Sequence, residues 1–298
     1  MWCTMKIRIH ELDVIFISYD EPNADKNYSD LLNILPWAKR IHGVKGSDSA
    51  HKAAAKISET DRFISVDADN VVDKEFFTQE LTITDENKDF VFSWCGRNAV
   101  NGLIYGNGGL KCWTKDFVLN MKTHENSDPT NSESFLEFCF DPKYFQMNEC
   151  FSTSYINGSP FQAWRAGFRE GVKMSLNRGA KTPDIRAVWW QNYQRLLIWC
   201  SIGADVKNGL WAIYGARHGC YMTMCTDWEH TNVRDFEYLT TLWKQESAQY
   251  NDSDLIEKIK YYGEELRNNL GLEIADMDAN ASKFFKRVYQ NMPRTYRK

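Results

Sequence analysis

The sequence predicts an α/β fold with a mostly parallel sheet flanked by helices and a helical C-terminal extension. Short β-prone apolar runs alternate with helix-like stretches in the first hundred residues, which is the order of parallel βαβ units. The third of these runs ends abruptly in Asp67 and Asp69. With 298 residues, 43% of them hydrophobic, the chain can bury a substantial core.

The expected elements are short apolar runs and helical stretches separated by polar or glycine-containing turns. In open α/β sheets ligands bind beyond the carboxyl ends of the strands, so the turns at 19–23 and 67–70 are candidate ligand sites. The order that we expect is strand 13–18, helix 27–40, strand 41–44, helix 50–60 capped by Ser49, strand 62–66 and strand 90–94.

Asp67 and Asp69 are spaced so that both carboxylates can converge on one hard cation where the strand ends. Mg²⁺ and Mn²⁺ prefer such oxygen ligands and leave positions open for phosphate oxygens. Two other Asp-x-Asp triplets, at 252–254 and 276–278, lie in polar, helix-like surroundings where solvated side chains are expected. The alternative for 67–69 is a strand-end turn in which Asp69 caps a following helix.

A glycine-rich stretch at 102–111 follows the fourth expected strand. Its four glycines permit positive φ angles and a close approach of the backbone to a ligand, and Lys111 adds a positive charge beside them. A hairpin turn is an equally good interpretation of the glycine content. The spacing excludes a P-loop.

The composition argues against several broad classes of protein. The net charge of −4 gives no overall basic bias towards nucleic acid. No run approaches the roughly 18 apolar residues of a membrane span. The eight cysteines form no CxxC pair, and no secretory signal is visible. We therefore expect a cytoplasmic protein with reduced thiols, no membrane association and no obligate protein partner.

The order of the motifs resembles that of GT-A glycosyltransferases. More narrowly it resembles the bacteriophage-type enzymes related to the base J glucosyltransferase, which are associated with sugar transfer to hydroxymethylated pyrimidines in DNA. The resemblance covers about residues 12–220. The segments that carry it are 13–23, 46–55 with Ala50-His51, 65–70, 105–111 and 164–170.

The resemblance implies a GT-A fold, a UDP-sugar donor and a Mn²⁺ or Mg²⁺ ion. It divides the chain into a nucleotide-sugar half (1–122), an acceptor half (123–230) and a helical extension with a basic tail (231–298). The implied roles at the nucleotide are base and ribose contacts for Tyr19 and Glu21, and a position near the ribose and the metal for Asp67. Asp69 would ligate the metal directly, and His218 (with His230 second) would be a further metal ligand. Gly108, Gly109 and Lys111 would line the donor sugar and the acceptor side.

Glu170 is the best candidate for a general base that would take the proton of an acceptor hydroxyl. On a helix Arg165 and Arg169 are neighbours at i, i+4 and could contact phosphates, with Glu170 on the adjacent face. The alternative is an amphipathic helix with solvated charges, in which Glu170 pairs on the surface with Lys173 or Arg169. If the reaction retains the configuration of the sugar, no such base is required.

Residues 165–195 form a local basic stretch, with seven Lys and Arg against two acids, and include Trp189 and Trp190. Cations on one surface can bind phosphates, and aromatic side chains can stack on a flipped base. The alternative is that both tryptophans are core residues. The last sixteen residues carry six Lys and Arg and no acid, and could be a solubilising end.

The leading hypothesis is a metal-dependent glycosyltransferase. It would move glucose or a pentose such as arabinose from a UDP-sugar to 5-hydroxymethylcytosine or a related hydroxymethylpyrimidine in phage DNA. A second hypothesis changes the acceptor to a surface glycan or protein. A third is a non-enzymatic module that binds nucleotide or DNA, which would not need Asp67, Asp69, Lys111 and Glu170 together. The metal, the sugar and the stereochemical outcome stay open.

Overall fold

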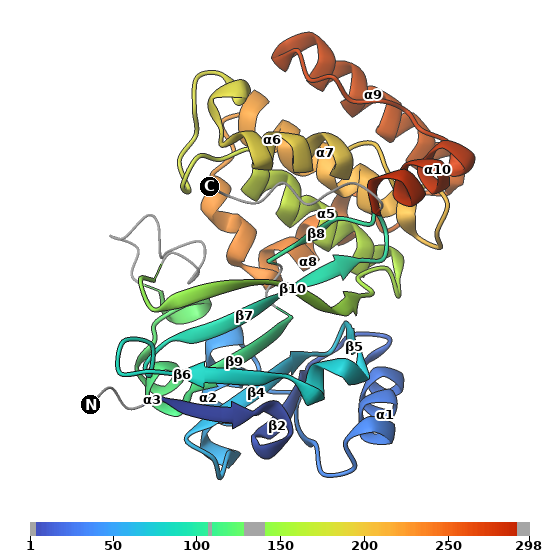
Figure 1. Cartoon of the computed structure of the whole chain (residues 1–298). Coiled ribbons are helices and arrows are strands. Elements are labelled where there is room, and N and C mark those ends of the chain that lie inside the picture. The colour runs from blue at the N-terminus through green and yellow to red at the C-terminus, as the bar shows by residue number, and fades with distance from the viewer. Residues whose placement is uncertain (1–3, 107–108, 128–140, 291–298) are drawn as a thin grey trace. The chain divides into compact units, whose positions relative to one another are not determined.

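The computed structural model describes residues 4–106, 109–127 and 141–290, which belong to two compact units. Unit 1 comprises the chain up to Asn98 together with Ile104–Tyr155, and unit 2 comprises Ala99–Leu103 and the chain from Ile156 onward. Figure 1 shows the strands of unit 1, mostly in blue to green, and the helices of unit 2, in yellow-green to red.

Unit 1 is built around a mixed eight-stranded sheet with the strand order β3-β2-β4-β9-β7-β10-β5, and β8 pairs with β7. The pairs β3–β2, β2–β4 and β7–β10 are parallel, whereas β9, β5 and β8 pair with their neighbours in antiparallel fashion. Two further strands, β1 (Met5–Arg8) and β6 (Glu80–Ile83), form a separate antiparallel pair. The strands of the main sheet are β2 (Asp13–Ser18), β3 (Lys39–His42), β4 (Arg62–Asp67), β5 (Asn70–Val72), β7 (Val91–Asn98), β8 (Ile104–Tyr105), β9 (Leu110–Thr114) and β10 (Tyr144–Ser154).

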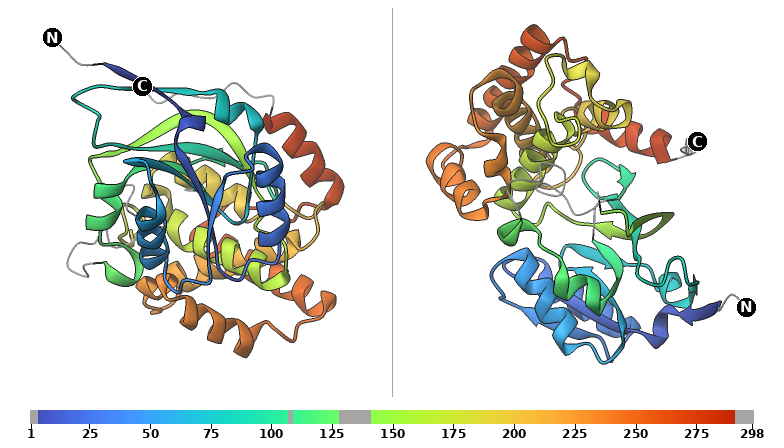
Figure 2. Two further views of the ribbon diagram at one scale, coloured as in Figure 1. Left: turned by 90° about the horizontal axis from the view of Figure 1, so that it is seen from below. Right: turned by 90° about the vertical axis from the view of Figure 1, so that its left-hand side faces the viewer.

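The two faces of the sheet are buried by different helices, because side chains alternate between the faces along each strand. Ile64 and Val66 pack in one apolar cluster with residues of α1 (Ala24–Ile34), and Phe63 packs in the other with Ala54 and Ala55 of α2 (Ser47–Ile57). Helices α1 and α2 are the two blue helices in both panels of Figure 2. The remaining helical segments of unit 1 are η1 (Ile9–Glu11), η2 (Lys74–Thr78), α3 (Lys115–Asn120) and η3 (His124–Asn126).

Most predicted elements of unit 1 are confirmed, with shifted ends. Strand 13–18 has the predicted bounds, and the α/β class with its β2-α1-β3-α2-β4 order is confirmed. The prediction of a helix over 27–40 is wrong at both ends: α1 stops at Ile34, just before Pro36, which cannot donate a backbone hydrogen bond. Residues 39–42 instead pair with β2.

Two further predictions about unit 1 need correction. Ser49 lies inside α2 and does not cap it; the side chain of Glu125 accepts hydrogen bonds from the backbone N–H groups of Asp48 and Ser49 at 3.2 and 2.9 Å. The prediction of a mostly parallel sheet holds for the first three strands. Beyond β4 the sheet is mixed: β9 runs antiparallel to both β4 and β7, whereas β7 and β10 are parallel to each other.

Unit 2 is helical in its described part. Helices α5 (Pro160–Met174) and α7 (Gly209–Cys225) make the most extensive contact between its described helices. Glycines line both sides of this contact. A side chain on Gly167 or Gly171 would collide with a carbonyl oxygen of α7, and one on Gly215 or Gly219 with a carbonyl oxygen of α5. The other helices are η5 (Ile185–Ala187), α6 (Trp190–Trp199), η6 (His230–Arg234), α8 (Phe236–Glu246), α9 (Asp252–Leu270) and α10 (Ala279–Gln290).

The two compact units have boundaries other than 122/123 and 230/231, and the division into a nucleotide-sugar half, an acceptor half and a helical extension stays a prediction. Strand β10 pairs with β7 and β5, so the chain up to Tyr155 belongs to the sheet unit. Helices on both sides of residue 230 belong to unit 2. Within residues 4–106, 109–127 and 141–290, no helix is long and apolar enough to cross a membrane.

Candidate functional site

Asp67 lies at the carboxyl end of β4, on the face of the sheet that α2 covers. Phe63, Ser65 and Asp67 alternate onto this face, and the Ser65 hydroxyl accepts a hydrogen bond from the indole N–H of Trp113 at 2.8 Å. The strand ends there because its next contacts go to loops: the N–H of Asp67 donates to the carbonyl of Gly109 at 2.9 Å. The Asp67 side chain is therefore left at the open edge of the sheet, where ligands of α/β proteins bind.

Asp69 lies in the tight turn between β4 and β5, so the alternative that it caps a helix is wrong. Its carboxylate accepts hydrogen bonds from Asn70 Nδ2 at 2.6 Å and from the Ser154 hydroxyl at 3.2 Å. Burial raises the pKa of Asp69 to about 7, and the negative charges of Asp67 and Glu21 act in the same direction. The site thus concentrates negative charge with neutral hydrogen-bond donors around it. We call Glu21, Asp67 and Asp69 the carboxylate site.

The loop after β2 lies beside this turn, as the sequence predicts. The Glu21 carboxylate accepts a hydrogen bond from the N–H of Tyr19 at 2.8 Å, and the Tyr19 side chain is 48% exposed. At the start of α1, Asn27 Nδ2 donates to the carbonyl of Ala68 at 2.8 Å. Helix α1, which follows the loop, is therefore joined to the Asp-x-Asp turn by a hydrogen bond from a side chain to the backbone.

Lys111 lies in β9, the strand next to β4, and Gly109 directly precedes that strand. Lys111 pairs in register with Ser65 and is only 2% exposed, and its Nζ lies 5.5 Å from the ring centre of Trp113. A side chain on Gly109 would collide with the amide of Asn70, so this glycine allows β9 to approach the Asp-x-Asp turn closely. Gly108 lies outside the described residues.

The carboxylate site fits a divalent cation in its chemistry. Asp67 and Asp69 offer oxygen ligands, and a cation would offset the repulsion that raises the pKa of Asp69. Within the described ranges, no group of three or more His, Cys, Asp and Glu side chains is arranged to hold a metal ion. Water and the phosphate oxygens of a ligand would supply the remaining coordination positions.

Two side chains of the site were missed by the sequence analysis as individual residues. Ser154 comes from β10, about 85 positions further along the chain than Asp69, and only the antiparallel β10–β5 pairing brings it close. His51, in the second turn of α2, packs edge-on against Trp113 with the ring centres 5.4 Å apart. The sequence signal for His51 was its spacing: it precedes Ala54 and Ala55 by three and four residues, which places it on the same, buried face of α2.

Arg165, Arg169 and Glu170 lie on α5 in unit 2. The guanidinium groups of Arg165 and Arg169 lie over the ring of Phe236, at 5.3 and 5.0 Å from its centre. Glu170 lies 3.9 Å from Lys173, which is the pair that the alternative interpretation expects, although both side chains are about four-fifths buried. The base role of Glu170 stays a prediction.

His218 lies inside unit 2 and is 1% exposed. Its ring packs 5.0 Å from Tyr262 and 5.1 Å from Phe168, and burial lowers its pKa to about 3. The imidazole is therefore neutral at pH 7, and its 3.4 Å approach to Glu246 is not an ion pair. Aromatic packing accounts for this histidine, and its metal role stays a prediction, as does that of His230.

The basic stretch of unit 2 is exposed where it carries tryptophans. Trp189 and Trp190 are 40% and 51% exposed, so the alternative that they are core residues is wrong. Arg186 is held by Asp184 at 2.9 Å, and Lys181 donates to the carbonyls of Thr226 and Trp228. In the basic tail, Lys286 pairs with Asp205 at 2.7 Å, and residues 291–298 lie outside the described part of the chain.

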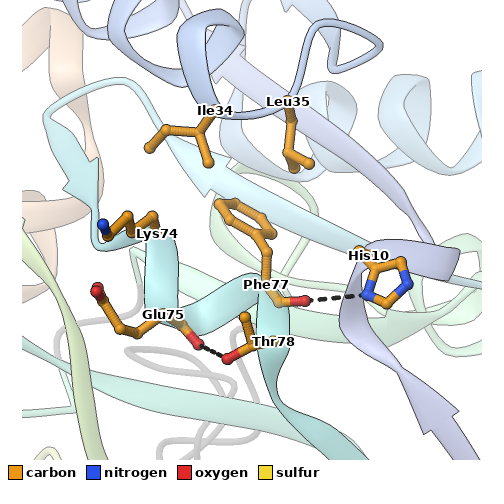
Figure 3. Close-up of a pocket in the computed structure, with 7 residues that line it drawn as sticks. All are labelled: His10, Ile34, Leu35, Lys74, Glu75, Phe77 and Thr78. Carbon is orange, nitrogen blue, oxygen red and sulfur yellow. Dashed lines mark hydrogen bonds between the residues drawn. The ribbon is translucent and has the colours of Figure 1, made fainter.

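A cavity of about 410 Å³ lies elsewhere in unit 1 (Figure 3). Ile34 and Leu35, at the end of α1, face Phe77 across it, and His10 Nδ1 contacts the carbonyl of Phe77 at 3.2 Å. None of the residues of the carboxylate site lines this cavity. The full lining is His10, Ile34, Leu35, Lys74, Glu75, Phe77 and Thr78.

No model of a known protein family matches the chain, and no curated protein sequence matches it.

Proposed function

We propose that this protein is a metal-dependent glycosyltransferase of the GT-A type. It would use a UDP-sugar as donor and a hydroxymethylated pyrimidine in DNA as acceptor. The observation that carries the proposal is the Asp69 carboxylate, held at the carboxyl end of β4 with its pKa raised to about 7 beside Asp67 and Glu21. A carboxylate in this state gains more from a bound cation than an exposed carboxylate would.

The surroundings of the carboxylate site support a nucleotide-sugar ligand. The parallel β3–β2–β4 strands place the Tyr19–Glu21 loop and the Asp-x-Asp turn at one edge of the sheet. The exposed ring of Tyr19 offers a stacking surface for a base, and the buried ammonium of Lys111 offers a positive charge close to Asp67. A strand-end turn that only faces solvent would need neither an exposed aromatic ring nor a buried ammonium group beside it.

In the proposed reaction the acceptor hydroxyl oxygen forms a bond to the anomeric carbon, and the bond from that carbon to the diphosphate oxygen breaks. A divalent cation, when bound, stabilises the charge of the leaving diphosphate. Asp67 and Asp69 would hold that cation, and Lys111 would add positive potential at the same edge. If the sugar is inverted, a carboxylate must take the acceptor proton, and Glu170 is the candidate.

The exposed Trp189 and Trp190 and the cations of 165–195 support DNA as the acceptor. Aromatic side chains that are exposed beside Lys and Arg suit the stacking of an unpaired base with its phosphates. A cell-surface glycan would not require this combination.

The test is sugar transfer measured by mass spectrometry. The full chain is incubated with Mn²⁺, a panel of nucleotide sugars, and DNA that contains cytosine, 5-hydroxymethylcytosine or 5-hydroxymethyluracil. A mass gain of one sugar on a hydroxymethylated DNA supports the proposal. Hydrolysis of a UDP-sugar without a mass gain on any DNA is consistent with a glycosyltransferase but overturns the proposal that DNA is the acceptor. No turnover of any nucleotide sugar overturns the proposal.

Matched variants separate the carboxylate site from general effects of charge. Asp69→Asn should abolish transfer, whereas Asp252→Asn, in the exposed triplet at 252–254, should leave it unchanged. For the acceptor, replacing Arg178, Lys181 and Arg186 by Gln should weaken DNA binding and reduce the salt slope of the affinity by about 0.9 for each phosphate that is no longer neutralised. An unchanged slope would remove the basic stretch from the DNA surface.

A further inference from the structure

His51 places a hydrogen-bond acceptor in the interior of unit 1, next to the carboxylate site. Helix α2 begins just after β3 and crosses to β4, so its first turns lie at the carboxyl edge of the sheet. One turn beyond them Ala54 and Ala55 pack on Phe63 and Trp113, and His51 precedes them on the same face. Its ring therefore lies over the part of the sheet that carries Asp67 and Lys111.

The hydrogen bonds of His51 determine which ring nitrogen carries the proton. Nδ1 lies 2.8 Å from the backbone carbonyl of Ser47, which can only accept, so Nδ1 is the protonated nitrogen. Burial lowers the pKa of His51; the charge of Lys111 also lowers it, and the charges of Asp67 and Asp48 oppose them. The ring is neutral, and Nε2 presents a bare lone pair.

This lone pair has no hydrogen-bond partner among the residues that the structure describes, although His51 is only 8% exposed. A buried polar atom without a partner is uncommon in folded proteins and destabilises them, so such an atom at a ligand site points to a group that the ligand supplies. The group must carry an N–H or O–H. A phosphate oxygen offers only lone pairs and cannot be the partner.

We propose that His51 Nε2 accepts a hydrogen bond from the ring N–H of the donor nucleotide's base and thereby selects uracil over cytosine. The inference rests on the proposed function, because it assumes a nucleotide at the carboxylate site. Uracil carries a hydrogen on N3, where cytosine has a lone pair that would face the lone pair of Nε2. Ribose hydroxyls are the same in both nucleotides and cannot produce this preference.

The test compares the affinities of UDP and CDP by isothermal titration calorimetry with the full chain and Mn²⁺. The wild type should bind UDP at least about tenfold more tightly than CDP, which corresponds to 1.4 kcal/mol. In His51→Asn the amide can still donate to Ser47 but no longer reaches the Nε2 position, so the preference should fall to near one. His51→Gln can place its amide oxygen near that position and should keep most of it.

His10→Asn is the control. His10 also contacts a backbone carbonyl through Nδ1, but it lines the cavity of Figure 3, to which no residue of the carboxylate site contributes. It should leave both affinities unchanged. An unchanged ratio of UDP to CDP affinity in His51→Asn would overturn the inference, and so would an equal loss for both nucleotides, which would indicate a ribose contact. If the wild type binds neither nucleotide, the proposed function fails instead.

Discussion

Replacing Asp69 by Asn should stabilise the metal-free protein while it abolishes sugar transfer. The carboxylate ionises with an ordinary pKa of 3.8 in the unfolded chain and with a pKa of about 7 in the folded protein. The folded state therefore holds this proton more tightly, and the free energy of unfolding falls as the pH rises from about 4 to 7. Above pH 7 the folded protein bears the full free-energy cost of the ionised Asp69 carboxylate, and Asn removes this cost.

The size of this gain follows from the pKa difference. Three units correspond to about 4 kcal/mol, at 1.36 kcal/mol for each unit. Because the Asp69 side chain is partly exposed, solvent screening lowers the expected gain to about 2 kcal/mol. Asn is nearly isosteric with Asp and can keep the contacts with Asn70 and Ser154, so the loss of packing is small.

The assay is urea-induced unfolding of wild type and variant at pH 4 and pH 8, with and without Mn²⁺. Without metal, the variant should be more stable at pH 8 and equal to the wild type at pH 4. Mn²⁺ should stabilise the wild type and leave the variant unchanged, because only the wild type can bind it tightly. A variant that is less stable than wild type at pH 8 without metal would refute the electrostatic reasoning.

Three further substitutions test individual contacts within unit 1 and within unit 2 by urea-induced unfolding. Glu125→Gln should cost about 1 kcal/mol at pH 7, since the carboxylate caps α2. Burial raises the pKa of Glu125, but hydrogen bonds such as that from the Ser49 N–H outweigh this and leave the pKa below its ordinary value. The stabilisation is therefore present above the ordinary pKa and should disappear as the pH falls through the lowered one. Gly167→Ala should cost about 3 kcal/mol, because the new Cβ meets a carbonyl of α7; a change below about 0.5 kcal/mol would contradict the close contact. Arg217→Met should cost about 3–5 kcal/mol, since this buried guanidinium donates to three backbone carbonyls and to Asp276 at 2.6 Å, and a neutral effect would show that these groups are satisfied otherwise.

The sequence predicts the first half of the sheet well because local signals there agree with the tertiary structure. The apolar runs that become β2 and β4 are buried on both faces, and such runs are characteristic of central parallel strands. The Asp-x-Asp turn and the Tyr19–Glu21 loop could be placed at one edge of the sheet, because the carboxyl ends of neighbouring parallel strands lie at the same edge.

The sequence could not predict what long-range pairing decides. Strand β9 returns antiparallel between β4 and β7, and nothing in its glycine content specifies those partners. Ser154 reaches Asp69 through the β10–β5 pairing, a contact that no local pattern encodes. The capping of α2 by Glu125 likewise joins residues more than seventy positions apart, so the local rule that favoured Ser49 gave the wrong cap.

The glycine-lined contact between α5 and α7 has a consequence for how unit 2 tolerates sequence change. Because the two helices meet backbone to backbone, their separation depends on four glycines and little on the size of neighbouring side chains. Arg165 and Glu170 lie on α5 outside this contact, so substitutions there change the contacts with Phe236 and Lys173 but do not push the two helix backbones apart. Among relatives of this chain we expect Gly167, Gly171, Gly215 and Gly219 to vary less than these two positions.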